Sequence, residues 1–191
     1  MWCGARMIIA GIDYSITSPA ICVGEVGAPF EECRLYSFGP KKYQGDCENI
    51  TIDAYPSWNL MMERYHLLSE WSMKILEQHI VEHVGIEGYS FGSKGKVFNL
   101  AENAGVLKYK IWQRNIELLE IPPTTAKKFA TGKGNANKEA LYQSFLDETS
   151  YDIKGKIGDT SKGVGNPVSD LVDAYYMFKF LSHQIETSET Q

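Results

Sequence analysis

The order of the apolar segments along the chain restricts its fold more than any other feature of the sequence. Three strand-like segments, residues 7–14, 18–26 and 32–38, follow one another with only short turns between them. After residue 57, helical and strand-like segments alternate. Consecutive strands predict an antiparallel meander, whereas alternation predicts parallel strands that are added through crossover helices. The sequence therefore predicts an α/β fold with a mixed sheet flanked by helices.

The remaining elements follow from periodicity and capping residues. Apolar residues at helical spacing and plausible N-caps predict five helices, and two further short apolar runs predict strands four and five. Segments 39–56 and 150–165 are rich in turn-forming residues and are predicted to be loops. The predicted helices cover 58–82, 97–113, 124–130, 137–148 and 167–184, and the later strands cover 83–88 and 116–121.

Length and hydropathy define the class of protein. A chain of 191 residues is predicted to form a single domain over residues 1–191. No apolar run approaches the ~20 residues that span a bilayer, so we expect no membrane partner and a cytoplasmic location. The four cysteines lie in the first quarter of the chain without CxxC spacing, which favours reduced thiols over a zinc site.

The basic residues are unevenly distributed along this acidic chain. The chain has a net charge of −5, which taken alone argues against a nucleic-acid partner. Residues 92–138, however, hold nine basic residues and three acidic ones. A local basic stripe binds phosphate even in an acidic protein, because the local field matters more than the total charge.

Four acidic residues occupy positions that suggest chemistry. Asp13 and Glu87 lie at the carboxyl ends of two apolar strands, and Asp170 and Asp173 lie three residues apart in the last helix. In the predicted sheet the first and fourth strands are parallel neighbours, so their acids emerge at one edge, where α/β proteins place their sites. Taken singly, Asp13 suits a strand-end turn, Glu87 an ion pair with a lysine, and the helix acids a first helical turn.

The joint pattern favours a metal site over those single interpretations. Four converging carboxylates repel one another unless divalent cations lie between them, and oxygen ligands favour Mg²⁺ or Mn²⁺ over Zn²⁺. Two such ions about 3.5–4 Å apart are the arrangement that hydrolyses phosphodiesters.

Three segments resemble the RuvC-type Holliday junction resolvases of the ribonuclease H-like superfamily. These segments are IAGIDYS at 9–15, VGIEGYSFG at 84–92 and NPVSDLVDAYYM at 166–177. KKFATGKGNANKEAL at 127–141 is similar to the basic region of that family, especially its phage-encoded branch. The resemblance extends from about residue 7 to residue 181, and it implies a ribonuclease H-like fold with a five-stranded mixed sheet.

The resemblance also implies roles for individual residues. Asp13, Glu87, Asp170 and Asp173 match the metal-binding acids, which would hold two Mg²⁺ ions, with Mn²⁺ as an alternative. Lys138 matches a catalytic-site lysine that contacts phosphate. The residues that match or neighbour DNA-contacting positions are Lys127 or Lys128, Lys133 in a glycine turn, and, in the loop after Glu87, Tyr89, Phe91, Lys94 and Lys96.

The function implied is that of a metal-dependent crossover junction endodeoxyribonuclease in DNA recombination and repair. Family members act as two-fold symmetric homodimers, and the helix from Val97 is the expected dimer element. A phage-encoded member would work in the host cytoplasm. The chain departs from many members at Tyr14-Ser15, where they carry a Pro-Gly turn, and in enlarged segments at 39–56 and 149–165. The alternatives are a related nuclease acting on flaps or RNA–DNA hybrids, and a non-catalytic protein that binds branched DNA.

Overall fold

A computed structural model describes residues 6–88 and 97–189 of the chain. Seven strands form one mixed sheet in the order β4-β5-β3-β2-β1-β6-β7. The strands are β1 (Ile8–Asp13), β2 (Ala20–Glu25), β3 (Arg34–Gly39), β4 (Gly45–Cys47), β5 (Ile50–Ala54), β6 (His83–Glu87) and β7 (Glu117–Ile121).

Strand pairing confirms the predicted topology. β1, β2 and β3 form an antiparallel meander, β6 pairs parallel with β1, and β7 pairs parallel with β6. β5 pairs parallel with β3. As a result β1, β3, β5, β6 and β7 all end at the same edge of the sheet, which is called the carboxyl edge below.

The predicted number of strands, five, was wrong. β4 and β5 lie within segment 39–56, which the sequence predicted to be a loop. β4 has only three residues, and its antiparallel partner β5 finds a place in the sheet only because it pairs with β3. Segment 150–165, also predicted to be a loop, contains a four-residue helix, α5 (Ile153–Lys156).

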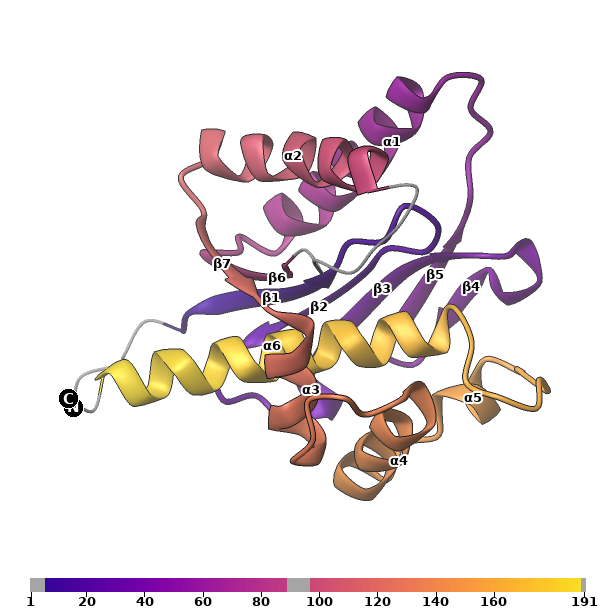
Figure 1. Cartoon of the computed structure of the whole chain (residues 1–191), viewed down its shortest axis with the longest axis vertical. Coiled ribbons are helices and arrows are strands. Elements are labelled where there is room, and N and C mark those ends of the chain that lie inside the picture. Colours follow the sequence, from indigo (N-terminus) through magenta and orange to yellow (C-terminus); the bar gives the residue numbers. More distant parts are fainter. Residues whose placement is uncertain (1–5, 89–96, 190–191) are drawn as a thin grey trace.

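Helices cover both faces of the sheet (Figure 1). α1 and α2 lie on one face, and α6 crosses the other, with α3, α4 and α5 beyond it. Their bounds are α1 (Met61–Gln78), α2 (Val97–Gln113), α3 (Pro123–Thr131), α4 (Lys138–Thr149) and α6 (Val168–Glu189). α1 begins three residues later than the sequence predicted, and α6 continues five residues beyond its predicted end.

The two helical layers explain why β1 reads as an unbroken apolar run. Ile9 belongs to the core beneath α6, whereas Ala10 and Ile12 belong to the core beneath α1 and α2. A strand covered on both faces needs apolar side chains on both. Gly11 lies where α6 crosses the strand, and a Cβ atom there would meet the backbone nitrogen of Phe178 at 2.0 Å.

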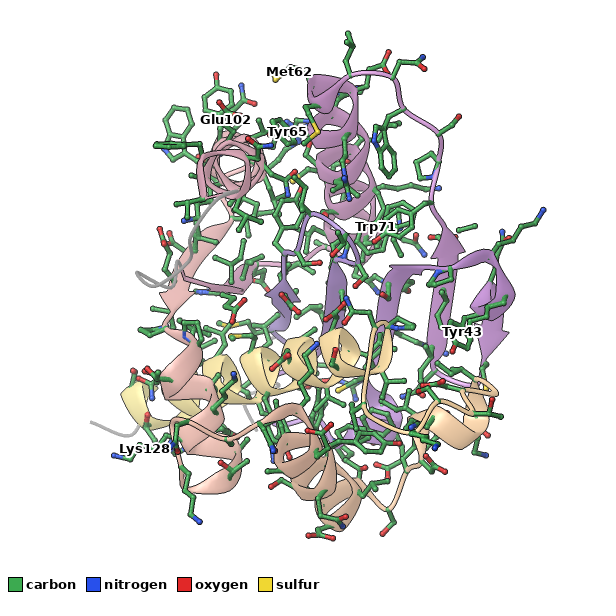
Figure 2. All side chains as sticks on the ribbon, turned by 45° about the vertical axis from the view of Figure 1, so that its right-hand side comes forward. Tyr43, Met62, Tyr65, Trp71, Glu102 and Lys128 are labelled. Atoms are coloured by element: carbon green, nitrogen blue, oxygen red, sulfur yellow. The ribbon has the colours of Figure 1, made fainter. Side chains whose placement is uncertain are left out.

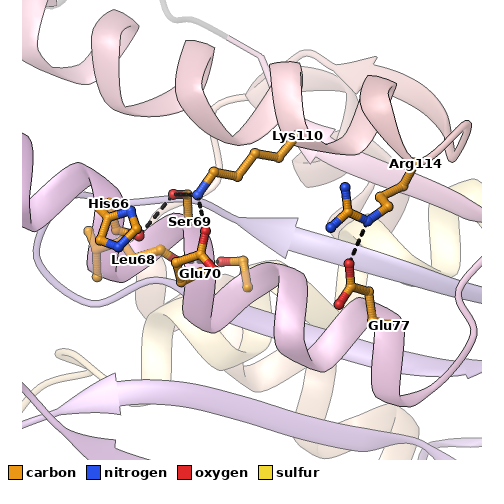
Figure 3. A network of polar contacts seen from close by, with 8 residues as sticks. His66, Leu68, Ser69, Glu70, Glu77, Lys110 and Arg114 are labelled. Carbon is orange, nitrogen blue, oxygen red and sulfur yellow. Dashed lines mark hydrogen bonds and ion pairs between the residues drawn. The ribbon is translucent and has the colours of Figure 1, made fainter.

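Polar contacts join α1 to α2 on the surface of their layer. Lys110 forms an ion pair with Glu70 and donates a hydrogen bond to Ser69 Oγ at 2.7 Å, and Arg114 Nε lies 2.7 Å from Glu77 Oε1 (Figure 3). These contacts fix which side of α2 faces α1. Across the two described stretches of chain, no helix combines the length and the apolar character that crossing a membrane requires.

Candidate active site

Asp13 and Glu87 lie side by side at the carboxyl edge. Asp13 is the last residue of β1 and Glu87 the last of β6, and the residues before them, Ile12 and Ile86, are partners in the parallel register. Asp13 is buried and Glu87 is half-buried. The predicted pairing of the two strands is therefore confirmed, and it brings the two carboxylates together at the edge.

α6 brings the other two acids to the same place. The helix begins at the carboxyl edge and runs back across β1, so that its first turns lie above the end of that strand (Figure 1). Asp170 is the third residue of α6 and is buried, and Asp173 follows one turn later and is half-buried. The close approach at Gly11 sets how near the helix comes to β1.

The carboxylates raise one another's pKa values. Burial raises the pKa of Asp13 well above its usual range, and the charges of Asp170, Glu87 and Asp173 raise it further, while Lys138 opposes the shift. Each of the other three acids thus lies close enough to Asp13 to act on its charge.

Burial also raises the pKa values of the other three acids. Burial, followed by the charge of Asp173, raises the pKa of Glu87 to about 7, and burial raises that of Asp170 to about 7. Burial raises the pKa of Asp173 to about 6, against the opposing charges of Lys127 and Lys138. A bound cation would stabilise the ionised form of these buried, mutually repelling acids.

The four carboxylates have the chemistry of ligands for a hard divalent cation, although they do not form a preformed metal cage. Among residues 6–88 and 97–189, no three His, Cys, Asp or Glu side chains lie close enough together to form a ready-made metal cage. The four carboxylates nevertheless interact electrostatically, and all their donors are oxygen, which Mg²⁺ and Mn²⁺ prefer. The chemistry of these four donors therefore fits such ions.

Two serines that the sequence analysis did not single out hold Asp170. Ser18 Oγ, in the turn between β1 and β2, donates a hydrogen bond to Asp170 Oδ2. Ser169 Oγ lies 3.2 Å from Asp170 Oδ1. Lys138 Nζ donates a hydrogen bond to Ser169 Oγ at 2.9 Å, so the lysine reaches the acid through this serine. For Ser169 the one signal in the sequence was its place directly before Asp170; Ser18 had none.

The structure distinguishes between the two adjacent lysines of α3. Lys127 is half-buried, and its charge acts on both Glu87 and Asp173. Lys128 is exposed and extends from the outer side of α3 (Figure 2). Lys133 is also exposed, in the turn between α3 and α4.

Part of the basic stripe serves the fold. Lys108 pairs with Glu120 of β7 at 2.7 Å, and Lys110 and Arg114 pair with acids of α1. Tyr89, Phe91, Lys94 and Lys96 lie outside the described residues, so their predicted DNA contacts stay predictions.

Comparisons with known proteins agree with this architecture. A sequence model of the crossover junction endodeoxyribonuclease RuvC family matches residues 44–151. No curated protein sequence matches the chain.

Three solved structures share the fold. RuvC of Thermus thermophilus in complex with a Holliday junction substrate superposes with a TM-score of 0.61 at 16% identity, over 94% of this chain and 96% of that one. The yeast mitochondrial Holliday junction resolvase gives 0.56 at 12% identity, over 95% and 80%. The fowlpox virus resolvase with Holliday junction DNA gives 0.54 at 14%, over 94% and 99%.

Proposed function

The chain belongs to the RuvC family, and from this premise we propose that it is a metal-dependent endonuclease that resolves four-way DNA junctions. The observation that carries the proposal is the convergence of Asp13 and Glu87, at the ends of two paired strands, with Asp170 and Asp173 of α6, which both act on the charge of Asp13. A family fold without this acidic cluster would support DNA binding alone.

The four acids hold divalent cations in this proposal, with Mg²⁺ preferred and Mn²⁺ as the alternative. A pair of bound ions supplies an activated water and stabilisation of the leaving oxygen, which is the chemistry of phosphodiester hydrolysis. Asp13 and Glu87 are fixed by the ends of paired strands, so their separation varies little. Asp170 and Asp173 lie on α6. The position of α6 therefore determines whether all four carboxylates can bind the same ions.

Lysines beside the acids position the DNA. Lys127 and Lys138 act on the charges of the acidic cluster, so each lies where a phosphate entering the site would meet it. Lys128 and Lys133 are both exposed, and in this proposal they contact the backbone of a DNA arm. Binding that rests on phosphate contacts survives the loss of a single metal-binding acid, whereas cleavage does not.

A homodimer supplies the second active site that a junction requires. α2 exposes three aromatic side chains, with Phe98 80%, Tyr109 57% and Trp112 70% exposed. Tyr109 and Trp112 stack with ring centroids 5.9 Å apart, and no atom lies within 4 Å of where a Gly105 Cβ would be. Large residues at the ends of a stripe with a small one at its centre suit a two-fold contact between copies of α2.

The test of the activity uses an immobile, end-labelled four-way junction with Mg²⁺ or with EDTA. We expect paired, symmetric nicks only on the junction and only with Mg²⁺. Linear duplex and RNA–DNA hybrid are the matched substrates. Cutting of the hybrid in place of the junction would move the protein to another nuclease class, and tight junction binding without cutting would leave a DNA-binding protein.

Two variants test the assigned residues. Asp13→Asn is expected to abolish cleavage while junction affinity in EDTA stays within about threefold, because binding depends on phosphate contacts. Trp112→Glu is expected to shift the protein from dimer to monomer in light scattering. The two strands of one junction should then no longer be nicked together. A dimeric Trp112→Glu protein would place the interface elsewhere, and normal cleavage by Asp13→Asn would refute the site.

A further inference from the structure

The hydrogen bonds around Asp170 close into a ring of five side chains. Ser18 Oγ donates to Asp170 Oδ2 and accepts from Asn166 Nδ2 at 2.6 Å. Lys138 Nζ donates to Asn166 Oδ1 at 3.3 Å and to Ser169 Oγ at 2.9 Å. Ser169 Oγ lies 3.2 Å from Asp170 Oδ1, which completes the circuit. The ring joins the β1–β2 turn, the first residue of α4 and the start of α6.

The donors and acceptors of the ring direct the hydroxyl of Ser18 toward the carboxylate. Each serine has one hydroxyl proton, and each also accepts a hydrogen bond, from Asn166 or from Lys138. The proton of Ser18 therefore goes to Oδ2 of Asp170. The proton of Ser169 has two acceptors, Asn166 Oδ1 at 2.9 Å and Asp170 Oδ1 at 3.2 Å, so Ser18 is the hydroxyl whose only proton is given to the carboxylate.

Burial makes this arrangement consequential. Ser18, Ser169 and Asp170 are 2%, 3% and 5% exposed, so water does not replace a missing hydrogen bond easily. An ionised carboxylate in such a place keeps one orientation only while its polar neighbours hold it. The oxygens of a metal-binding carboxylate have to be oriented in the same way.

The turn between β1 and β2 is built to deliver Ser18. Ser15 Oγ accepts hydrogen bonds from the backbone nitrogens of Thr17 at 3.3 Å and Ser18 at 2.8 Å. Arg64 of α1 donates a hydrogen bond to the carbonyl oxygen of Ile16. These contacts fix the turn, and with it the hydroxyl of Ser18 that faces Asp170.

We propose that Ser18 and Asn166 are positioning residues, which orient the carboxylate of Asp170 for a divalent cation and couple it to Lys138. Neither residue touches the reacting atoms, and both act through Asp170. The inference rests on the proposed function for its metal, but it concerns a hydrogen-bonded ring that a DNA-free measurement can test.

The experiment follows the thermal unfolding midpoint of the full chain against Mn²⁺ concentration, without DNA. Bound metal raises the midpoint of the wild-type protein. We expect Ser18→Ala and Asn166→Ala to need about 10–100 times more Mn²⁺ for the same rise, the usual effect of losing a residue that orients a ligand. Ser72→Ala is the matched control, since Ser72 is buried on α1 and donates to the carbonyl oxygen of Leu68 at 2.9 Å.

Two further readouts separate positioning from general damage. Junction affinity in EDTA should stay within about twofold of wild type in both variants, because no phosphate contact is removed. The double variant should lose no more metal affinity than the single variant that binds metal less tightly. One broken hydrogen bond already opens the ring, and the effects of coupled residues do not add. Multiplying effects would mean that the two residues act independently, and would overturn the ring.

The remaining outcomes are also distinct. A Ser18→Ala protein whose Mn²⁺ response equals that of wild type or of Ser72→Ala would overturn the proposal. If the wild-type protein fails to cut a junction but its Mn²⁺ response is lost in Ser18→Ala, the proposed function fails and the ring stands. If the junction is cut normally by Ser18→Ala at limiting Mg²⁺, the function stands and the ring fails.

Discussion

Replacement of Gly11 by alanine tests how the sheet and α6 together form the acidic cluster. A Cβ atom at this position would lie 2.0 Å from the backbone nitrogen of Phe178 and 2.3 Å from the carbonyl oxygen of Ala174. Both neighbours are backbone atoms of α6, so no side-chain rotation relieves the contact. The helix has to move away from β1, and it carries Asp170 and Asp173 with it.

The size of the effect follows from these distances. Ordinary van der Waals contact for a Cβ begins at 3.4 Å, so α6 has to withdraw by about 1.4 Å. Overpacking a core costs about 1–3 kcal/mol, and a collision with backbone puts Gly11→Ala near the upper value. In a chain of this length, a loss of about 3 kcal/mol lowers the melting temperature by roughly 6–12 °C.

The displacement should affect cleavage more than binding. A shift of about 1 Å in catalytic groups can cost on the order of 100-fold in rate. Lys128 and Lys133, which we propose to contact DNA, are exposed and lie outside α6, so junction affinity in EDTA should change by less than about threefold. Thermal melting, single-turnover cleavage and junction binding measure the three quantities on one preparation.

Gly165→Ala is the matched control. Gly165 lies in the segment before α6, has no atom within 4 Å of a new Cβ and does not need the left-handed backbone region. Alanine there should leave stability equal or slightly higher. Wild-type melting and cleavage by Gly11→Ala would refute the reasoning, because they would mean that α6 does not approach β1 this closely.

Three further predictions concern the site and the fold. First, burial raises the pKa values of Glu87 and Asp170 to about 7, so the metal-free folded state binds more protons than the unfolded state and loses stability as the pH rises from about 5 through 7. In melts with EDTA, Asp170→Asn should lose less stability over this pH range than the wild-type protein does. Equal losses of stability would contradict the prediction. Second, Lys127→Ala should slow single-turnover cleavage at least tenfold and Lys128→Ala less than threefold, because only Lys127 acts on the acids; equal slowing would count against the assignment. Third, Ile80 is 79% exposed with a φ of 54°, so Ile80→Gly should raise the free energy of unfolding by about 0.5–1 kcal/mol in urea titrations, unless the side chain makes a contact in the folded state.

Prediction from the sequence succeeded where the signal was local. β1 and β6 were found because each is a short apolar run, and the acid that ends each run was visible beside it. The parallel pairing of the two strands followed from the crossover through α1, since connections of this kind have few alternatives. The N-cap of α4 was found for the same reason: Asn137 accepts a hydrogen bond from the nitrogen of Ala140, three residues later.

Elements whose stability comes from distant partners were missed. β4 and β5 were hidden among turn-forming residues, because a three-residue strand gains its hydrogen bonds from β5 and β5 gains its own from β3. The choice between Lys127 and Lys128 could not be made either. Adjacent residues on a helix point about 100° apart, so only the docking of α3 on its neighbours decides which lysine faces the acids.

The sequence by itself determined the class of fold, the four acids and the edge at which two of them emerge, because strand and helix patterns repeat over a few residues. Tertiary structure alone decided how close α6 lies to β1 and which groups hold Asp170. Ser18 and Asn166 are 148 residues apart, and nothing in the sequence near either residue indicates that the two meet. Their hydrogen bonds exist only because the β1–β2 turn, α4 and α6 meet at one point, and no local pattern encodes that meeting.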